Sequence, residues 1–466
     1  MELFEAKKRL YPQSVKGKIR KIKSILNFIF LTIFFLSPFL RFERGNGAPN
    51  QAILIDLPNS KAYFFAIEIW PQEVFYLAAL LIIAAIMLFF VTSLFGRVWC
   101  GYACFQTVWT DIFIAIERFF QGYRNARILL DRKTNFEKFY KKFLTHLSWL
   151  IVSFATGFGF VCYFNDAIEL SQNFFSLFSN ITIMGWILGI GAMTYIMAGF
   201  AREHVCTFMC PYSRFQSAMF DENTLIITYD EKRGEPRGKH KQGESFENRG
   251  DCIDCKQCVV VCPTGIDIRN GLQMECIACG LCIDACDSIM EKINRPKGLI
   301  RYDTEKHLSQ PIAQNKFKAF RLRTFYYCLI LTITCGFMIT KLMNKSLLEV
   351  DAIPDRNPIF VKLSDGSIRN GYTIKIMNKT HQNKSFTISV ASPQEAIIKM
   401  QSYENVNLDN LPVNSDSVKS FKIYAILPEK LLAQSSEGRN FINLKIKDNT
   451  AVNSEEKIIE AIFISK

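Results

Sequence analysis

Two runs of cysteines decide how the middle of this 466-residue chain folds. The first reads Cys252-Ile-Asp-Cys255-Lys-Gln-Cys258-Val-Val-Val-Cys262-Pro263, and the second reads Cys276-Ile-Ala-Cys279-Gly-Leu-Cys282-Ile-Asp-Ala-Cys286. Three thiolates spaced two residues apart can wrap one corner of an iron–sulfur cubane, while the fourth thiolate points away toward a second cubane. Repeated twice, this spacing is typical of two-cluster bacterial ferredoxins. It predicts one 4Fe-4S cluster held by Cys252, Cys255, Cys258 and Cys286, and another held by Cys276, Cys279, Cys282 and Cys262.

A zinc ribbon and free thiols are the alternatives for these eight cysteines, and the doubled spacing disfavours both. One departure from the pattern is visible, because Asp287 follows Cys286 where Pro263 follows Cys262. This departure changes a turn and the local charge but not the number of ligands. The predicted chemistry is one-electron transfer between two neighbouring clusters. Such a module belongs in a reducing compartment, where disulfides do not persist.

Five uncharged apolar stretches flank the cysteine module, four before it and one after it. Spanning a bilayer takes roughly 17–25 apolar residues, and all five fall in this range. A buried core helix is the alternative for each stretch. The first could also be a signal peptide, but no small-residue cleavage pattern follows it. The predicted membrane helices are Ser24–Leu40, Val74–Phe95, Leu147–Phe164, Ile181–Phe200 and Thr324–Thr340.

The positive charges alternate along the chain in step with these helices. Residues 1–23 hold eight Lys and Arg, residues 97–145 hold nine and residues 201–323 hold nineteen, whereas 41–72 hold three and 165–180 none. Positively charged loops stay in the cytoplasm. We therefore expect a multi-pass protein of the bacterial inner membrane, with the N-terminus and the ferredoxin module in the cytoplasm and the C-terminal tail in the periplasm. The net charge of +13 then reflects topology, and nucleic-acid binding has no motif to support it.

The tail after about residue 343 has a different pattern and contains no Cys. Short alternating runs separated by turn residues predict an antiparallel sandwich of immunoglobulin type. His381 lies in an expected turn and is read as a solvated residue. The expected strands are Thr373–Met377, Ser385–Val390, Ala396–Met400, Lys419–Ile426, Phe441–Ile446 and Ile458–Ile464.

A second cysteine signal follows two of the predicted membrane helices. Cys100-x3-Cys104 comes after the second helix and Cys206-x3-Cys210 after the fourth, with similar flanks, which indicates an internal duplication. Positions i and i+4 share one face of a helix, so each pair is expected to offer two thiolates to one metal. Soft thiolates favour Cu(I), zinc or iron–sulfur, and buried packing is the alternative.

The neighbours and the remaining cysteines are read as structural. For His204 and Met209, packing or a solvated polar contact is favoured over metal ligation. Cys162, Cys328 and Cys335 stand alone in predicted membrane helices, where packing explains them. Neither a GxGxxG fingerprint nor a P-loop is present, so direct hydride chemistry is not expected.

Several motifs together resemble the CcoG/FixG/RdxA family, the accessory proteins of cbb3-type cytochrome c oxidase. They are Arg97-Val-Trp-Cys-Gly-Tyr-Ala-Cys-Phe-Gln-Thr-Val-Trp, Cys206-Thr-Phe-Met-Cys-Pro-Tyr-Ser-Arg-Phe-Gln-Ser, Gly234-Glu-Pro-Arg-Gly, Cys262-Pro-Thr-Gly-Ile-Asp-Ile-Arg-Asn-Gly-Leu-Gln and Gly298-Leu-Ile-Arg-Tyr. The resemblance covers about residues 20–340, and the tail fits the family's immunoglobulin-like domain by position. The family motif is Cys-x3-Cys-Pro, and here Phe105 stands where the first pair should have Pro, which puts the geometry of that pair in doubt.

The resemblance implies an iron–sulfur oxidoreductase that reduces Cu(II) to Cu(I) during assembly of the oxidase. Copper would be substrate or ligand at Cys100, Cys104, Cys206 and Cys210, and oxidase subunits or copper chaperones would be partners. The cytoplasmic electron donor stays unknown. A quinol-linked membrane ferredoxin serving a reductase, or a non-enzymatic assembly scaffold, would fit the same motifs.

The predicted organisation is a multi-domain integral membrane protein with five helices, an inserted two-cluster ferredoxin and an all-β tail. A basic segment at 1–23 precedes a four-helix membrane region at 24–228. The ferredoxin domain and its linkers occupy 229–323. The fifth membrane helix at 324–342 leads to the immunoglobulin-like domain at 343–466.

Overall fold

The computed structural model describes residues 10–45, 48–240, 246–309, 318–401, 407–428, 430, 439–450 and 456–465. Part of the basic segment 1–23 therefore lies outside the described residues. The chain divides into two compact units. One comprises Met1–Arg41 and Gln51–Ile339, and the other Phe42–Asn50 and Thr340–Lys466.

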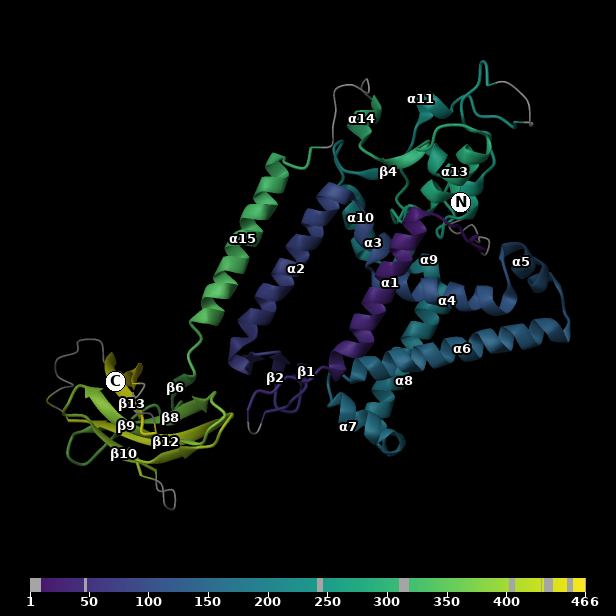
Figure 1. Cartoon of the computed structure of the whole chain (residues 1–466). Coiled ribbons are helices and arrows are strands. Elements are labelled where there is room, and N and C mark those ends of the chain that lie inside the picture. Colours follow the sequence, from purple (N-terminus) through teal and green to yellow (C-terminus); the bar gives the residue numbers. More distant parts are fainter. Residues whose placement is uncertain are drawn as a thin grey trace, which may run out of the picture. The chain divides into compact units, whose positions relative to one another are not determined.

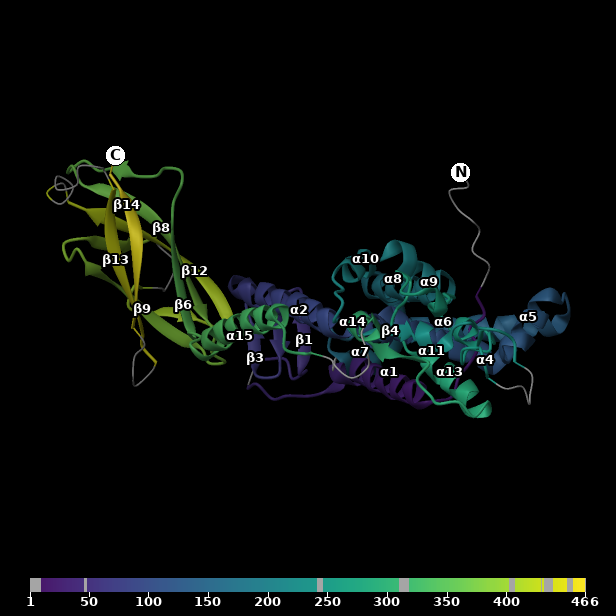
Figure 2. The ribbon, with the colours of Figure 1, turned by 90° about the horizontal axis from the view of Figure 1, so that it is seen from above.

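Within the residues that the structure describes, five stretches of helix are long and apolar enough to cross a membrane, as the sequence predicts. Figures 1 and 2 show the helices that carry them, and the helix α6 begins well before the predicted start at Leu147. In α2 only four of 22 residues are buried within the protein, which suits a helix that faces lipid. The helices are α1 (Lys18–Leu36), α2 (Val74–Phe95), α6 (Phe136–Val161), α8 (Ile181–Ile196) and α15 (Leu322–Met343).

Helices α6 and α8 pack closely because small residues line their contact. A Cβ atom at Gly157 would lie 2.1 Å from the Ile187 carbonyl oxygen, and one at Gly191 would lie 3.1 Å from the Ser153 carbonyl oxygen. Small residues let the backbones of membrane helices approach each other. The two helices are therefore in close backbone contact at Gly157 and Gly191.

Short helical segments follow α2 and α8 and carry the two cysteine pairs. After α2 come α3 (Val98–Tyr102), α4 (Phe105–Gln121) and α5 (Arg124–Arg132). After α8 come two π-helical turns, η4 (Met197–Ala201) and η5 (Val205–Met209), with α9 (Arg202–His204) between them, and then α10 (Pro211–Ala218). The other connections hold the sheet β1 (Ile53–Asp56), β2 (Lys61–Phe64) and β3 (Ile67–Ile69), with η1 (Ser37–Phe39), η2 (Pro71–Glu73), α7 (Ala167–Gln172) and η3 (Phe174–Ser179).

The cysteine module is closed by a small antiparallel sheet of β4 (Ile226–Tyr229) and β5 (Ile300–Asp303). Tyr229 ends β4, and α11 (Glu231–Gly234) follows at the start of the segment that leads to the first cysteine run. Residues 241–245 lie outside the described part. The module also contains α12 (Gln257–Val260), η6 (Ile268–Asn270), α13 (Leu281–Lys292) and α14 (Glu305–Ser309).

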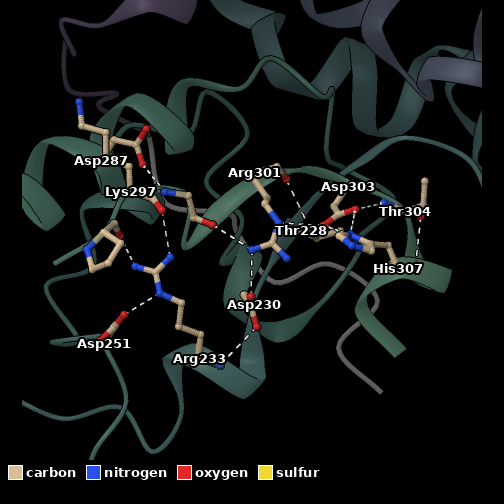
Figure 3. Close-up of polar contacts among 12 residues, drawn as sticks. Thr228, Asp230, Arg233, Asp251, Asp287, Lys297, Arg301, Asp303, Thr304 and His307 are labelled. Carbon is tan, nitrogen blue, oxygen red and sulfur yellow. Dashed lines mark hydrogen bonds and ion pairs between the residues drawn. The ribbon is translucent and has the colours of Figure 1, made fainter. Parts of the chain in front are cut away.

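Charged side chains fasten the two strands to the loops around them (Figure 3). Arg301 pairs with Asp230 at 2.9 Å and with Asp303 at 2.8 Å. The buried carboxylate of Asp251 accepts from Arg233 at 2.6 Å and from Arg295 at 2.5 Å. These pairs hold the segments that lead into and out of the cysteine runs.

The tail is a two-sheet sandwich, as predicted, with a continuous apolar core between the sheets. All six expected strands are present, and β6, β7 and β11 were not foreseen. One sheet has the order β10-β12-β8-β6 with β7 beside β8, and the other has the order β11-β9-β13-β14. The strands are β6 (Leu348–Pro354), β7 (Val361–Lys362), β8 (Ile368–Asn378), β9 (Lys384–Ser392), β10 (Ile397–Met400), β11 (Leu411–Val413), β12 (Ser417–Leu427), β13 (Arg439–Asp448) and β14 (Glu456–Ile464).

Candidate iron–sulfur and thiol centres

The two predicted ligand sets surround two neighbouring cavities. One cavity is lined by Cys252, Cys255, Cys258 and Cys286. The other is lined by Cys262, Cys276, Cys279 and Cys282, and Cys258 contributes to both. The structure therefore brings together the thiols that the spacing groups, including the exchange of the fourth cysteine between the two runs.

The loops carrying these thiols are tightly wound. Asp254, Lys256 and Ala278 have positive φ angles of 51°, 55° and 52°. Such left-handed residues are costly and concentrate where a binding site requires them. They fold each run around its cavity within a few residues.

Burial makes these thiols weaker acids than an ordinary cysteine. It raises the pKa of Cys258, Cys276 and Cys286 to about 12 each, so a bare thiol here stays protonated at neutral pH. Bound iron would oppose this effect of burial, because a metal displaces the proton of its thiol ligand. Among the described residues, no group of three or more His, Cys, Asp or Glu is arranged to hold a single metal ion. Two sets of four thiols around cavities fit 4Fe-4S clusters instead.

The backbone is broken within each of the other two cysteine pairs. Cys100 lies in α3, but Cys104 is extended (φ −61°, ψ 126°) and begins α4. Cys206 lies in η5, and Cys210 is likewise extended (φ −82°, ψ 109°) and begins α10. The prediction that each pair shares one helix face is therefore wrong. At Cys210 the following Pro211 disfavours the helical conformation, and Cys104 adopts the same form although Phe105 replaces the proline.

The four thiols of these pairs nevertheless gather in one place. Burial raises the pKa of Cys100 to about 11, and Cys104 and Cys210 lie close enough to add to this shift. Cys206 is within electrostatic range of the other three. The Cys100 thiol donates to Gln216 Oε1 at 3.0 Å, which ties the first pair to α10 beside the second. As it stands, the group does not form a closed cage for one ion.

The thiol group touches the second ferredoxin cavity. Cys100 packs in one buried cluster with Ile277 and Cys279, and Cys206 lies against that cluster. A Cβ atom at Gly101 would lie 2.8 Å from the Ile277 carbonyl oxygen and 2.9 Å from Cys279 Cα. The missing side chain thus allows α3 to contact the ligand loop directly.

Arg97 lies at this junction and was not singled out from the sequence. Its side chain is 2% exposed, and its Nη1 donates to the Met274 carbonyl oxygen. Its positive charge opposes the effect of burial on the pKa of both Cys100 and Cys276. The available signal was its place as the first charged residue after a long apolar run, three residues before Cys100.

The remaining cysteines and the two flanking residues lie apart from this group. His204 stacks on Phe208 with a ring separation of 5.8 Å, and Met209 is exposed. Cys162 is buried at the C-terminal end of α6, while Cys328 is exposed and Cys335 half-buried on α15. His381 lies in the β-sandwich unit.

Together, the apolar helices, the two cavities and the thiol group define a membrane-associated protein with a two-cluster ferredoxin module. Models of known families match three parts of the chain. A 4Fe-4S dicluster domain matches residues 201–305, a 4Fe-4S binding domain residues 77–122, and the "IG-like fold at C-terminal of FixG" residues 338–465.

Relatives of similar length cover almost the whole chain. The nitrogen fixation protein FixG of Rhizobium meliloti is 39% identical over 94% of this chain and 90% of its own. Proteins RdxB and RdxA of Cereibacter sphaeroides are 41% and 40% identical, over 96% and 92% of this chain and 95% and 91% of their own. The chain belongs to the FixG/RdxA/RdxB family, and the resemblance seen in the sequence is confirmed.

Proposed function

We propose that this protein is a membrane-bound electron carrier that reduces Cu(II) to Cu(I) for assembly of a cbb3-type oxidase. Its two 4Fe-4S-binding regions support electron transfer. The observation that carries the proposal is the buried contact between Cys100, Cys206 and the loop of Cys279. This contact supports an electron route from a cluster held by the loop of Cys279 to the thiols of Cys100 and Cys206.

The eight ferredoxin thiols are the proposed cluster ligands, in the two sets given by the cavities. When bound, the clusters supply one-electron chemistry. The protein's part is to bury the thiols, to hold the loop of Cys276 through Arg97, and to keep that loop against α3.

Copper is the proposed substrate at Cys100, Cys104, Cys206 and Cys210. Cu(II) prefers nitrogen and oxygen ligands, whereas Cu(I) prefers thiolate. Binding to these thiols would therefore stabilise the product of one-electron reduction. Since the four thiols do not enclose an ion as they stand, the proposal is a transient encounter and not a resident copper centre.

The proposed topology follows the distribution of positive charge. The N-terminus and ferredoxin module face the cytoplasm, and the β-sandwich faces the periplasm, where oxidase subunits or copper chaperones could meet it. The proposed domain boundaries are those given by the sequence.

The test is anaerobic and uses the full chain in detergent. After reduction of the clusters, stoichiometric Cu(II) is added, and cluster absorbance is followed together with a Cu(I) chelator. Rapid cluster oxidation matched by Cu(I) is expected, and it should be lost in Cys206→Ser/Cys210→Ser. The matched control is Cys328→Ser/Cys335→Ser, two changes outside the thiol group. Equal rates of copper reduction in both double variants would show that these thiols do not take part in electron transfer to copper.

A further inference from the structure

A large cavity that the proposed function does not use lies between α4, α5, α6 and the π-helical wall after α8. Its volume is about 740 Å³. Pockets that bind small molecules typically measure about 300–1,000 Å³. The cavity is therefore large enough for a ring compound with polar substituents.

Its charged side chains balance one another. Lys138, Lys142 and Arg202 line it together with Glu117, Asp131 and Glu203. Glu117 is 2% exposed and pairs with Arg127 at 2.7 Å and with Arg202 at 2.8 Å, while Lys142 pairs with Asp131 at 2.8 Å. Since the positive charges are already matched, the cavity suits a neutral ligand better than a phosphate or nucleotide.

The wall on the side of α6 and η4 is aromatic. Trp149, His146 and Phe200 line the cavity, and the rings of His146 and Phe200 stack with centroids 6.0 Å apart. The His146 Nδ1 shares a hydrogen bond of 2.9 Å with the Tyr195 hydroxyl, which fixes the imidazole plane. Phe200 is 58% exposed on α8's continuation, so the wall opens toward the apolar outer surface. A flat ring with hydrogen-bonding groups and an apolar tail fits this lining.

The backbone of this wall adopts energetically unfavourable conformations. Gly199 and Phe200 lie in the π-helical turn η4, and Arg202 has φ +36°. Segments of π-helix and left-handed residues other than glycine are rare and concentrate at functional sites. Their presence here indicates that the cavity is a built feature of the fold.

A second, smaller cavity continues from the first toward the thiols. The two share Leu10, Arg202 and Glu203 as lining residues, and the smaller one reaches Cys206 and Ile277. Ile277 packs with Cys279 of the second ligand set. The smaller cavity would thus connect a ligand in the large cavity to the residues beside the predicted cluster ligands.

We propose that this cavity binds the ring of a lipid-soluble hydroquinone and that this quinol is the electron donor. The proposal rests on the electron-transfer part of the proposed function and not on copper. Oxidation breaks the two O–H bonds and forms two C=O bonds. Two electrons leave, and the two clusters, when bound, would accept one electron each. One proton passes to the Glu203 carboxylate and the other to water at the polar mouth.

Binding is tested on the oxidised full chain in detergent with decyl-benzoquinone, a short-tailed quinone, by isothermal titration. Saturable binding at one site is expected, with affinity roughly five- to tenfold lower in Phe200→Ala and in His146→Leu, because each removes one ring or hydrogen-bond contact. The matched control is Phe139→Ala, which removes an exposed ring of α6 outside the cavity. No saturable binding, or equal affinity in all four proteins, would overturn the proposal.

The donor role is tested by mixing the reduced quinone anaerobically with oxidised protein and following the bleaching of the clusters. In Glu203→Gln the rate should fall by roughly 10² because a proton acceptor is lost, while the affinity for the quinone stays as in the unmodified chain. An unchanged rate in Glu203→Gln would overturn this carboxylate as the acceptor. No copper is present in either experiment, so a failure here is separate from a failure of copper reduction.

Discussion

The missing side chain at Gly101 fixes how closely α3 approaches the loop of Cys276 and Cys279. We expect Gly101→Ala to displace that loop, because its Cβ would lie 2.8–3.0 Å from three backbone atoms. Overpacking of this kind costs about 1–3 kcal/mol. Iron content per chain should fall toward half while the other ligand set keeps its cluster. Gly189→Ala is the control, since its Cβ meets nothing within 4 Å, and equal iron content in both variants would contradict the prediction.

The stability of the β-sandwich is expected to depend on pH through the carboxylate of Asp448. It pairs with Lys384 at 2.5 Å and accepts from Thr450, and although burial acts in the opposite sense, these contacts hold its pKa below the usual 3.8. Its contribution to stability is therefore present above about pH 3.9 and is lost as the pH falls through its lower folded value.

Replacing the Asp448 carboxylate by a neutral amide of the same shape tests its contribution to stability. Asp448→Asn should cost about 1–3 kcal/mol at pH 7, since hydrogen bonds to charged groups are lost. Urea unfolding at pH 7 and at pH 2 should show the difference from the unmodified domain shrinking at the lower pH. A difference that does not change with pH would rule out the ion pair as its source.

The residues that could be predicted are those whose roles follow from a motif of fixed spacing. The eight ferredoxin cysteines are grouped by covalent spacing, and their two cavities follow that grouping. Arg97 and Gly101 could not be found in this way, because each acts on a segment far away in the chain. Their roles appear only when α3 and the loop of Cys276 and Cys279 are packed together.

Among the helices, the close contact between α6 and α8 depends on glycines, and Gly157 is the most tightly enclosed of them. A Cβ at Gly157 would lie 2.1 Å from the Ile187 carbonyl oxygen, so Gly157→Ala must push the helices apart. We expect a loss of about 1–3 kcal/mol, seen as a lower melting temperature in detergent. Gly185→Ala on α8, with open space around it, should melt like the unmodified chain. Identical melting of both variants would show that this contact contributes nothing.

The boundaries of an element could be predicted where its apolar pattern is long. The prediction failed where the local backbone conformation ends an element. The five apolar helices were found by length and composition. The breaks at Cys104 and Cys210 were missed, since an i, i+4 spacing assumes a continuous helix and takes no account of the extended residue that starts the next one. Strands β7 and β11 have two and three residues and leave no alternation to detect.

The tail should fold without the rest of the chain. Among the described residues, the apolar side chains of its core all lie between Leu348 and Phe463. Residues 344–466 expressed alone should give an all-β circular dichroism spectrum and one cooperative unfolding transition. A sloping, non-cooperative melt would show that the sandwich needs the preceding helix.

The start of α1 is capped from the far side of the sequence. The Asp284 carboxylate, between the ligands Cys282 and Cys286, accepts from the backbone N–H groups of Ile19 and Arg20 at 3.2 and 2.7 Å. Ile19 and Arg20 precede Asp284 by 265 and 264 positions in the sequence. At a ribosomal rate of about 5–20 residues per second, the first membrane helix waits roughly 13–53 s for its cap. A helix of the ferredoxin module thus caps the first apolar helix of the chain, and folding of that module acts on a segment that left the ribosome long before.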